Sequence, residues 1–154
     1  MSILRFSHLG ICVSNMERSL HFYRDLLGFR YVSELNVAGE PANTLLQLQD
    51  VKLHAAYLER DGTRIELLHF ASPATEGEDA SRPFNRSGFT HLSLRVEGLE
   101  ALLKELAQAG VRVLEDTNVY NPQFRAGAVL ITDPDGALIE LVEAPGDPSA
   151  PPGS

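Results

Sequence analysis

The amino-acid sequence predicts an α+β protein made of two similar modules. Two short segments each occur twice in similar form. His-Leu-Gly-Ile-Cys-Val at 8–13 returns as His-Leu-Ser-Leu-Arg-Val at 91–96, and Asp-Gly-Thr-Arg-Ile-Glu-Leu-Leu at 61–68 returns as Asp-Gly-Ala-Leu-Ile-Glu-Leu-Val at 135–142. The copies keep the same order, and their spacings differ only by a loop's length, which indicates an internal duplication. We therefore expect each module to contain a strand, a helix and then three or four strands.

The first module is expected to span residues 4–70. Alternation within 4–14 predicts a strand with Leu9, Ile11 and Val13 on one face. The N-cap signal Ser14-Asn15 then precedes apolar residues at helical spacing, and Gly28 is placed to end that helix. Further strands are expected near 29–36, 44–50, 52–59 and 64–70, and the pattern leaves open whether 44–59 forms one bent strand or two.

The second module, residues 88–144, repeats this order. A strand is expected at 89–96, and leucines at helical spacing predict a helix at 98–109 that stops at Gly110. Strands are then expected near 111–116, 126–132 and 137–143. The run Asp133-Pro-Asp-Gly predicts the turn between the last two of them.

Length and composition limit the kind of protein. A chain of 154 residues with 44% hydrophobic residues is long enough for one domain at 1–144 made of the two modules. Residues 71–87 are rich in Ser, Pro, Gly and charge and are expected to be a linker, and 145–154 a flexible tail. The net charge of −8 argues against nucleic acid or an anionic membrane as the partner. With one cysteine and no apolar signal core, a cytoplasmic protein is expected.

The duplicated segments contain four candidate metal ligands. Strand alternation puts His8 and His91 on the face opposite to the apolar residues that a helix would cover. Glu66 and Glu140 alternate with Ile and Leu in the last strand of each module, so they also leave the helix-packed face. If the sheets curl, the four side chains can meet inside the concavity.

Each residue taken alone also has a structural interpretation. A histidine in a strand is commonly a hydrogen-bonded structural residue, and a glutamate between apolar residues could be an edge carboxylate. A buried carboxylate, however, needs a partner or a metal. Two imidazoles and two carboxylates carry a formal charge of −2, which one divalent ion such as Zn, Ni, Co, Mn or Fe would neutralise, leaving positions for substrate.

The sequence resembles the vicinal oxygen chelate superfamily over residues 4–144. The segments that carry the resemblance are 8–13, 19–29, 64–68, 89–96 and 133–142. It implies a paired βαβββ fold whose curled mixed sheets enclose one divalent metal, with ligands His8, Glu66, His91 and Glu140. It also implies a homodimer that acts on a small molecule.

The resemblance implies a lyase or isomerase of the glyoxalase I or methylmalonyl-CoA epimerase type. Such an enzyme transfers a proton alpha to a carbonyl through a metal-stabilised enolate. Glu140, or Glu66 after loosening from the metal, is expected to be the base. Two alternatives stay open: an Fe(II) extradiol-type dioxygenase, and a binding or resistance protein without chemistry.

Other polar residues are weaker candidates. Arg95 shares the strand face of His91 and could bind a substrate carboxylate or phosphate, although an exposed strand-end arginine would have the same pattern. Tyr57 is expected to be a packing residue, and His54 and His69 have no distinctive context. The helix segment that contains His21 is expected to carry no chemistry.

Overall fold

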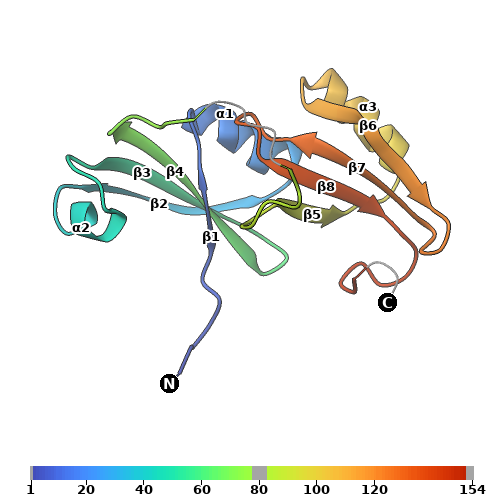
Figure 1. Cartoon of the computed structure of the whole chain (residues 1–154), viewed down its shortest axis with the longest axis horizontal. Helices are drawn as coiled ribbons and strands as arrows, with labels where there is room; N and C mark the ends of the chain where they lie inside the picture. The colour runs from blue at the N-terminus through green and yellow to red at the C-terminus, as the bar shows by residue number, and fades with distance from the viewer. Residues whose placement is uncertain (1, 78–82, 152–154) are drawn as a thin grey trace. The chain divides into compact units, whose positions relative to one another are not determined.

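Two units, Met1–Gly77 and Glu78–Ser154, make up the chain in the computed structural model, which describes residues 2–77 and 83–151. Each unit contains one four-stranded mixed sheet and helical segments (Figure 1). The α+β class and the order of strand, helix and three strands in each half are therefore as predicted. The boundary between the units falls within the segment expected to be a linker.

The first unit holds seven elements. They are β1 (Leu9–Cys12), α1 (Met16–Leu20), the π-helical segment η1 (His21–Leu26), β2 (Arg30–Ala38), α2 (Ala42–Leu46), β3 (Lys52–Arg60) and β4 (Thr63–Ser72). The sheet order is β1-β4-β3-β2, in which β1 pairs in parallel with β4 and the other neighbours are antiparallel. The outer strand β1 and the central strand β4 are thus brought together although three helical segments and two strands separate them in sequence.

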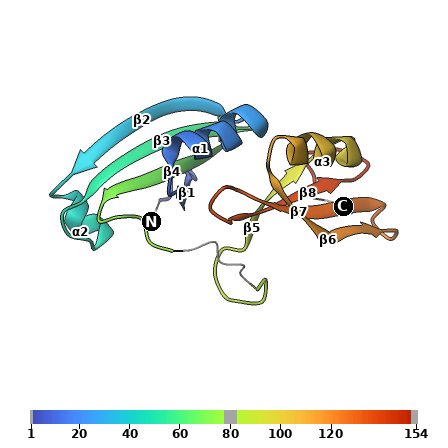
Figure 2. The ribbon, with the colours of Figure 1, turned by 90° about the horizontal axis from the view of Figure 1, so that it is seen from above.

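The second unit has the same topology. Its elements are β5 (His91–Arg95), α3 (Leu99–Gln108), β6 (Arg112–Asn121), β7 (Ala126–Thr132) and β8 (Leu138–Glu143). The order β5-β8-β7-β6 again places the first strand in parallel beside the last. The helix α1 contacts β4 in the first unit, and α3 contacts β6 and β8 in the second (Figure 2).

The helix ends confirm the signals in the sequence. The Asn15 side chain accepts a hydrogen bond from the Arg18 N–H at 2.9 Å and caps α1. Gly28, with φ of 72°, lets the chain leave η1 in the left-handed conformation that glycine adopts at low cost. In the second unit the Asp133 carboxylate accepts from the N–H groups of Asp135 and Ala137, which closes the predicted turn.

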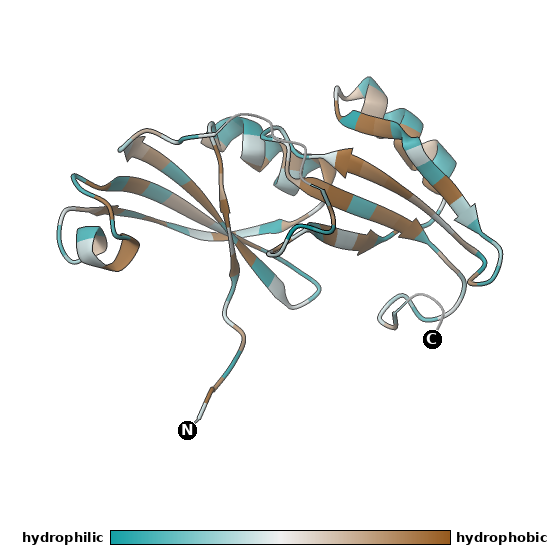
Figure 3. Cartoon of the chain, viewed as in Figure 1, coloured by the Kyte–Doolittle hydropathy of each residue, from teal (hydrophilic) through white to brown (hydrophobic). Residues whose placement is uncertain are grey.

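The helix-packed face of each sheet forms its core. Ile65 and Leu67 on β4, and Ile139 and Leu141 on β8, are all at most 1% exposed. Each such side chain contributes about 1.5–3 kcal/mol to stability relative to an exposed one. In Figure 3 most of the ribbon of β7 and β8 has the colour of hydrophobic residues. The glutamates between these core residues therefore point to the other face, as the alternation predicts.

The prediction of a strand at 44–50 is wrong. Residues 42–46 form the helix α2, because the Glu40 carboxylate accepts hydrogen bonds from the N–H and hydroxyl of Thr44 and so starts a helical turn. The Asn43 side chain accepts from the N–H of Val51 and closes the loop. Leu46 and Leu48 alternate with glutamines there, as in a strand, but Leu48 is 37% exposed and Leu46 is only half-buried, so the alternation marks no buried face.

Three strand boundaries also differ from the prediction. The first strand begins at Leu9 and not near residue 4, and the preceding apolar side chains of Ile3, Leu4 and Phe6 are exposed. Strand β6 runs to Asn121, because a break in register between Leu114 and Val119 lets pairing with β7 resume beyond residue 116. Strand β4 runs to Ser72, into the segment expected to be a linker.

Candidate functional site

In the first unit, His8 and Glu66 face one another. His8 lies directly before β1, and Glu66 lies in the middle of β4 opposite Gly10. The parallel pairing brings His8 Nε2 to 3.1 Å from Glu66 Oε2. The side chain of Glu66 is 13% exposed and that of His8 is 34% exposed, so both can be reached from the surface of this unit.

The second unit contains an equivalent pair. His91 is the first residue of β5, and Glu140 lies in β8 opposite Ser93. His91 Nε2 is 3.6 Å from Glu140 Oε2, and the Glu140 side chain is 34% exposed. The duplication in the sequence thus becomes a duplication of one histidine–glutamate pair per unit, in each case between two parallel strands.

A hydroxyl residue precedes each histidine and orients its ring. Ser7 Oγ lies 2.9 Å from His8 Nδ1, and Thr90 Oγ1 lies 2.9 Å from His91 Nδ1. When Nδ1 carries the proton and donates it to the hydroxyl oxygen, the lone pair is on Nε2, the nitrogen that faces the glutamate. In that tautomer both imidazoles can offer Nε2 as a ligand. The repeated dipeptide of a hydroxyl residue followed by histidine can be read from the sequence, but strand alternation alone does not predict that the hydroxyl bonds the histidine ring.

Each glutamate also accepts a hydrogen bond from a hydroxyl. The Tyr57 hydroxyl on β3 donates to the Glu66 carboxylate, and this bond, together with burial, raises the pKa of Tyr57 to about 12. Ser93 Oγ donates to Glu140 Oε2 at 2.7 Å. The Tyr57 ring also lies edge-on to the His8 imidazole, with centroids 5.5 Å apart. Tyr57 therefore contacts both candidate ligands of the first unit, and the expectation of a packing role missed this, because only the register of β3 against β4 brings it there.

The donor atoms fit a divalent ion. Two ligands at about 2.1 Å from one metal and separated by 90° to 110° lie roughly 3.0–3.4 Å apart. The Nε2–Oε2 distances of 3.1 and 3.6 Å are close to this range. Imidazole nitrogen and carboxylate oxygen together suit Zn, Ni, Co, Mn and Fe. Across residues 2–77 and 83–151, no three His, Cys, Asp or Glu side chains are grouped closely enough to hold a metal ion.

Arg95 binds main-chain carbonyls of its own unit. Its guanidinium donates hydrogen bonds to the carbonyls of Ala144, Pro145 and Ala150, at 2.8, 3.3 and 3.2 Å. These bonds hold part of the segment expected to be a flexible tail beside β5. The guanidinium N–H groups, which the sequence suggested for binding a substrate, therefore make hydrogen bonds within the protein.

The remaining histidines have partners away from the two pairs. His54 Nε2 lies 2.9 Å from a carboxylate oxygen of Glu34, and His69 Nδ1 lies 3.3 Å from the Val13 carbonyl. His21 contacts Asp25 on the exposed side of η1. Within the described part of the chain, none of the contacts found for these three histidines involves a candidate ligand. This agrees with their ordinary sequence context.

Comparison with known proteins identifies the family. Residues 5–141 match the glyoxalase/bleomycin resistance protein/dioxygenase superfamily, a span that includes all four candidate ligands. The chain belongs to this superfamily. The resemblance found in the repeated segments is therefore confirmed at the level of the superfamily.

Individual known proteins are similar to the chain at low identity. The mitochondrial methylmalonyl-CoA epimerase of Mus musculus is 24% identical over 141 residues, which cover 91% of this chain and 73% of the epimerase. YaeR of Escherichia coli, a protein without characterised function, is 27% identical over 93% of this chain and 98% of its own. The crystal structure of a glyoxalase family protein from Bacillus cereus superposes with a TM-score of 0.80 at 24% identity, covering 95% of this chain and 97% of the other.

The described helices are short. Within residues 2–77 and 83–151, none is both long and apolar enough to cross a membrane.

Proposed function

We propose that the protein is a divalent-metal-dependent lyase or isomerase that transfers a proton alpha to a carbonyl. The observation that carries this proposal is the equivalent histidine–glutamate pair in each unit, with Nε2 of the histidine directed at the carboxylate. A structural ion pair would need neither the repetition nor the same nitrogen in both units. Membership in a superfamily that includes glyoxalases supports the same conclusion.

The ligands of the proposed ion are His8, Glu66, His91 and Glu140. Two neutral imidazoles and two carboxylates compensate the charge of one divalent ion. When bound, the ion supplies a positive charge that stabilises negative charge developing on the substrate oxygens. Because the proposed set takes two ligands from each unit, it requires both units, from one chain or from two copies of a homodimer.

Glu140 is the residue that we assign as the base. Its side chain is more exposed than that of Glu66, 34% against 13%, and it lies farther from its histidine. A substrate can therefore approach the Glu140 carboxylate more easily. The carboxylate oxygen would take the proton from the substrate carbon. The same carboxylate would then return it to a neighbouring carbon, or a second acid would protonate the original carbon from the opposite face, so that either route gives a net reaction.

Replacement of Glu140 by Gln tests this role. We expect Glu140→Gln to lower kcat by about 10²–10⁴-fold, because the amide cannot accept the proton. Glu105→Gln, on the exposed side of α3, is the matched control and should turn over normally. Acyl-CoA esters are the first substrates to assay, since two mitochondrial methylmalonyl-CoA epimerases, of mouse and Dictyostelium discoideum, are similar to the chain; hemithioacetals follow. Normal turnover by Glu140→Gln would show that the base is another residue.

Metal analysis separates this proposal from its alternatives. We expect one divalent ion per ligand set in the purified protein, lost in His8→Ala and in His91→Ala. Bound iron with oxygen uptake in the presence of a catechol would indicate a ring-cleaving dioxygenase instead. A protein that binds small molecules but no metal would be a binding protein without chemistry.

Mixing two inactive variants shows where the ligands come from. If each site combines one unit from each of two chains, a dimer of His8→Ala with His91→Ala contains one site with all four ligands. Mixing after reversible unfolding should then restore part of the activity. If both units of one chain form the site, the mixture stays inactive.

A further inference from the structure

The two glutamates receive their hydroxyl groups from different neighbouring strands: Glu66 from the strand that follows in the hairpin order, β3, and Glu140 from the parallel strand β5. Glu66 on β4 lies between Gly10 of β1 and Tyr57 of β3. Glu140 on β8 lies between Ser93 of β5 and, on the other side, Leu130 of β7. Since paired residues in a sheet share a face, these neighbours lie next to the carboxylates.

The two units therefore differ at two equivalent positions beside the glutamate. Together the two differences leave each glutamate with one hydroxyl neighbour. Where the second unit has Ser93, the first has Gly10, which offers no hydroxyl. Where the second unit has Leu130, the first has Tyr57, which supplies one. Each carboxylate thus has a hydroxyl donor on one neighbouring strand and an apolar residue or glycine on the other.

We propose that Tyr57 and Ser93 are equivalent positioning residues, each holding the carboxylate of one metal ligand in the orientation that binding requires. The inference rests on the proposed metal site and adds residues that act through its ligands. Tyr57 is the more constrained of the two, because its ring also contacts His8. Hydrogen bonds to metal ligands fix ligand orientation, and their removal commonly costs 10–100-fold in metal affinity.

The test measures Co²⁺ affinity in full-length protein by competition with a chromophoric chelator, together with the visible absorption spectrum of the bound Co²⁺. We expect Tyr57→Phe to weaken Co²⁺ binding about 10-fold or more and to change the spectrum. Tyr31→Phe is the matched control: the Tyr31 hydroxyl also bonds a carboxylate, that of Glu34, but on β2 and away from the pair. It should bind Co²⁺ as tightly as the wild type.

A rescue variant tests the equivalence directly. Gly10→Ser combined with Tyr57→Phe moves the hydroxyl from β3 to β1, the arrangement found around Glu140. Gly10 does not have a positive φ, and an added Cβ would lie 3.2 Å from Leu68 Cδ1, the movable end of a side chain. We expect the double variant to recover part of the affinity lost in Tyr57→Phe. Ser93→Ala should lose affinity in the same way, and Ser93→Thr should retain it.

The outcomes distinguish this inference from the proposed function. If the wild type binds Co²⁺ and both Tyr57→Phe and Ser93→Ala bind it equally well, the positioning role is wrong and the metal site stands. If the wild type binds no divalent metal, the proposed function fails and this inference fails with it. Circular dichroism and Tm of the metal-free variants should match the wild type, so that a loss of affinity reports on the ligands and not on folding.

Discussion

Single hydroxyl residues orient the four candidate ligands through short polar contacts. Ser7 and Thr90 bond the histidines, while Tyr57 and Ser93 bond the glutamates. All four are hydroxyl residues, which can donate to a carboxylate and accept from an imidazole N–H. The two units use different hydroxyl residues, yet each unit presents the same two donor atoms, a histidine Nε2 and a glutamate oxygen.

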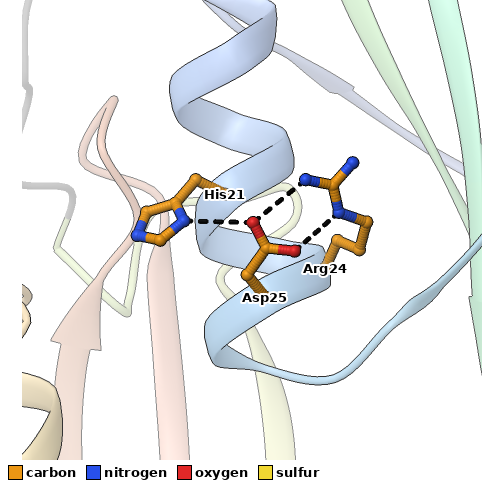
Figure 4. Close-up of polar contacts among 3 residues, drawn as sticks. All are labelled: His21, Arg24 and Asp25. Atoms are coloured by element: carbon orange, nitrogen blue, oxygen red, sulfur yellow. Dashed lines mark hydrogen bonds and ion pairs between the residues drawn. The ribbon is translucent and has the colours of Figure 1, made fainter.

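A different polar cluster occupies the exposed side of η1. Asp25 contacts His21 at 3.1 Å and Arg24 at 2.6 Å (Figure 4). The hydrogen bond from Arg24, followed by the one from His21, lowers the pKa of Asp25 to about 2. The depressed pKa means that the folded protein favours ionised Asp25. The contribution to stability is present above the ordinary carboxyl pKa and is lost as the pH falls towards 2.

The pKa of Asp25 can be measured residue by residue. In an NMR titration we expect its carboxyl carbon to have a midpoint near 2. Arg24→Ala should move that midpoint upward, because the hydrogen bond that lowers the Asp25 pKa most is removed. Lys104→Ala, which removes the cation paired with Glu100 on α3, should leave it unchanged. An Asp25 midpoint that does not respond to Arg24→Ala would show that the arginine is not its main partner.

Among the elements, the end of η1 depends on one glycine and one arginine. Gly28 has φ of 72°, and a Cβ added there would lie 2.6 Å from Nη1 of Arg60. Arg60 uses that nitrogen to donate a hydrogen bond to the Leu27 carbonyl. A side chain at position 28 therefore strains the backbone and displaces the arginine that caps the helix.

Two glycine substitutions separate these effects. Gly28→Ala should lower the free energy of unfolding by more than the roughly 1–2 kcal/mol expected for an alanine in the left-handed conformation. Gly62→Ala, at φ of 76° with no atom within 4 Å of the added Cβ, should cost the backbone part alone. Urea unfolding at constant m-value measures both. Equal losses would mean that Arg60 moves aside without cost.

For the whole molecule, one shared ion would couple the two units. A saturating divalent metal should raise Tm, because it binds only the folded protein. At a metal concentration of 100 times Kd, the gain in the free energy of unfolding is about 2.7 kcal/mol. We expect His8→Ala and His91→Ala each to abolish nearly all of this gain, although each variant leaves one pair intact. Glu105→Gln should retain the full gain. If each single variant kept about half of the stabilisation, the pairs would be binding separate ions.

Much of the fold could be predicted from the sequence, because its signals are local. The Asn15 cap, the left-handed Gly28 and the Asp133 turn act over a few residues, so the chain shows them without tertiary information. The alternation around Glu66 and Glu140 reflects burial of their neighbours on one face of a sheet. The helix at 42–46 was not predicted, because hydrogen bonds from Thr44 to the Glu40 carboxylate outweigh an alternating pattern that forms no buried face.

The sequence by itself determined the duplication, the superfamily and the identity of the four candidate ligands. Only the tertiary structure decided what surrounds them. The register of β3 against β4 places Tyr57 beside Glu66, and that of β5 against β8 places Ser93 beside Glu140. The segment after β8 folds back so that its carbonyls accept the hydrogen bonds of Arg95. These contacts join residues far apart in the chain, and strand pairing, which no local pattern encodes, is what brings them together.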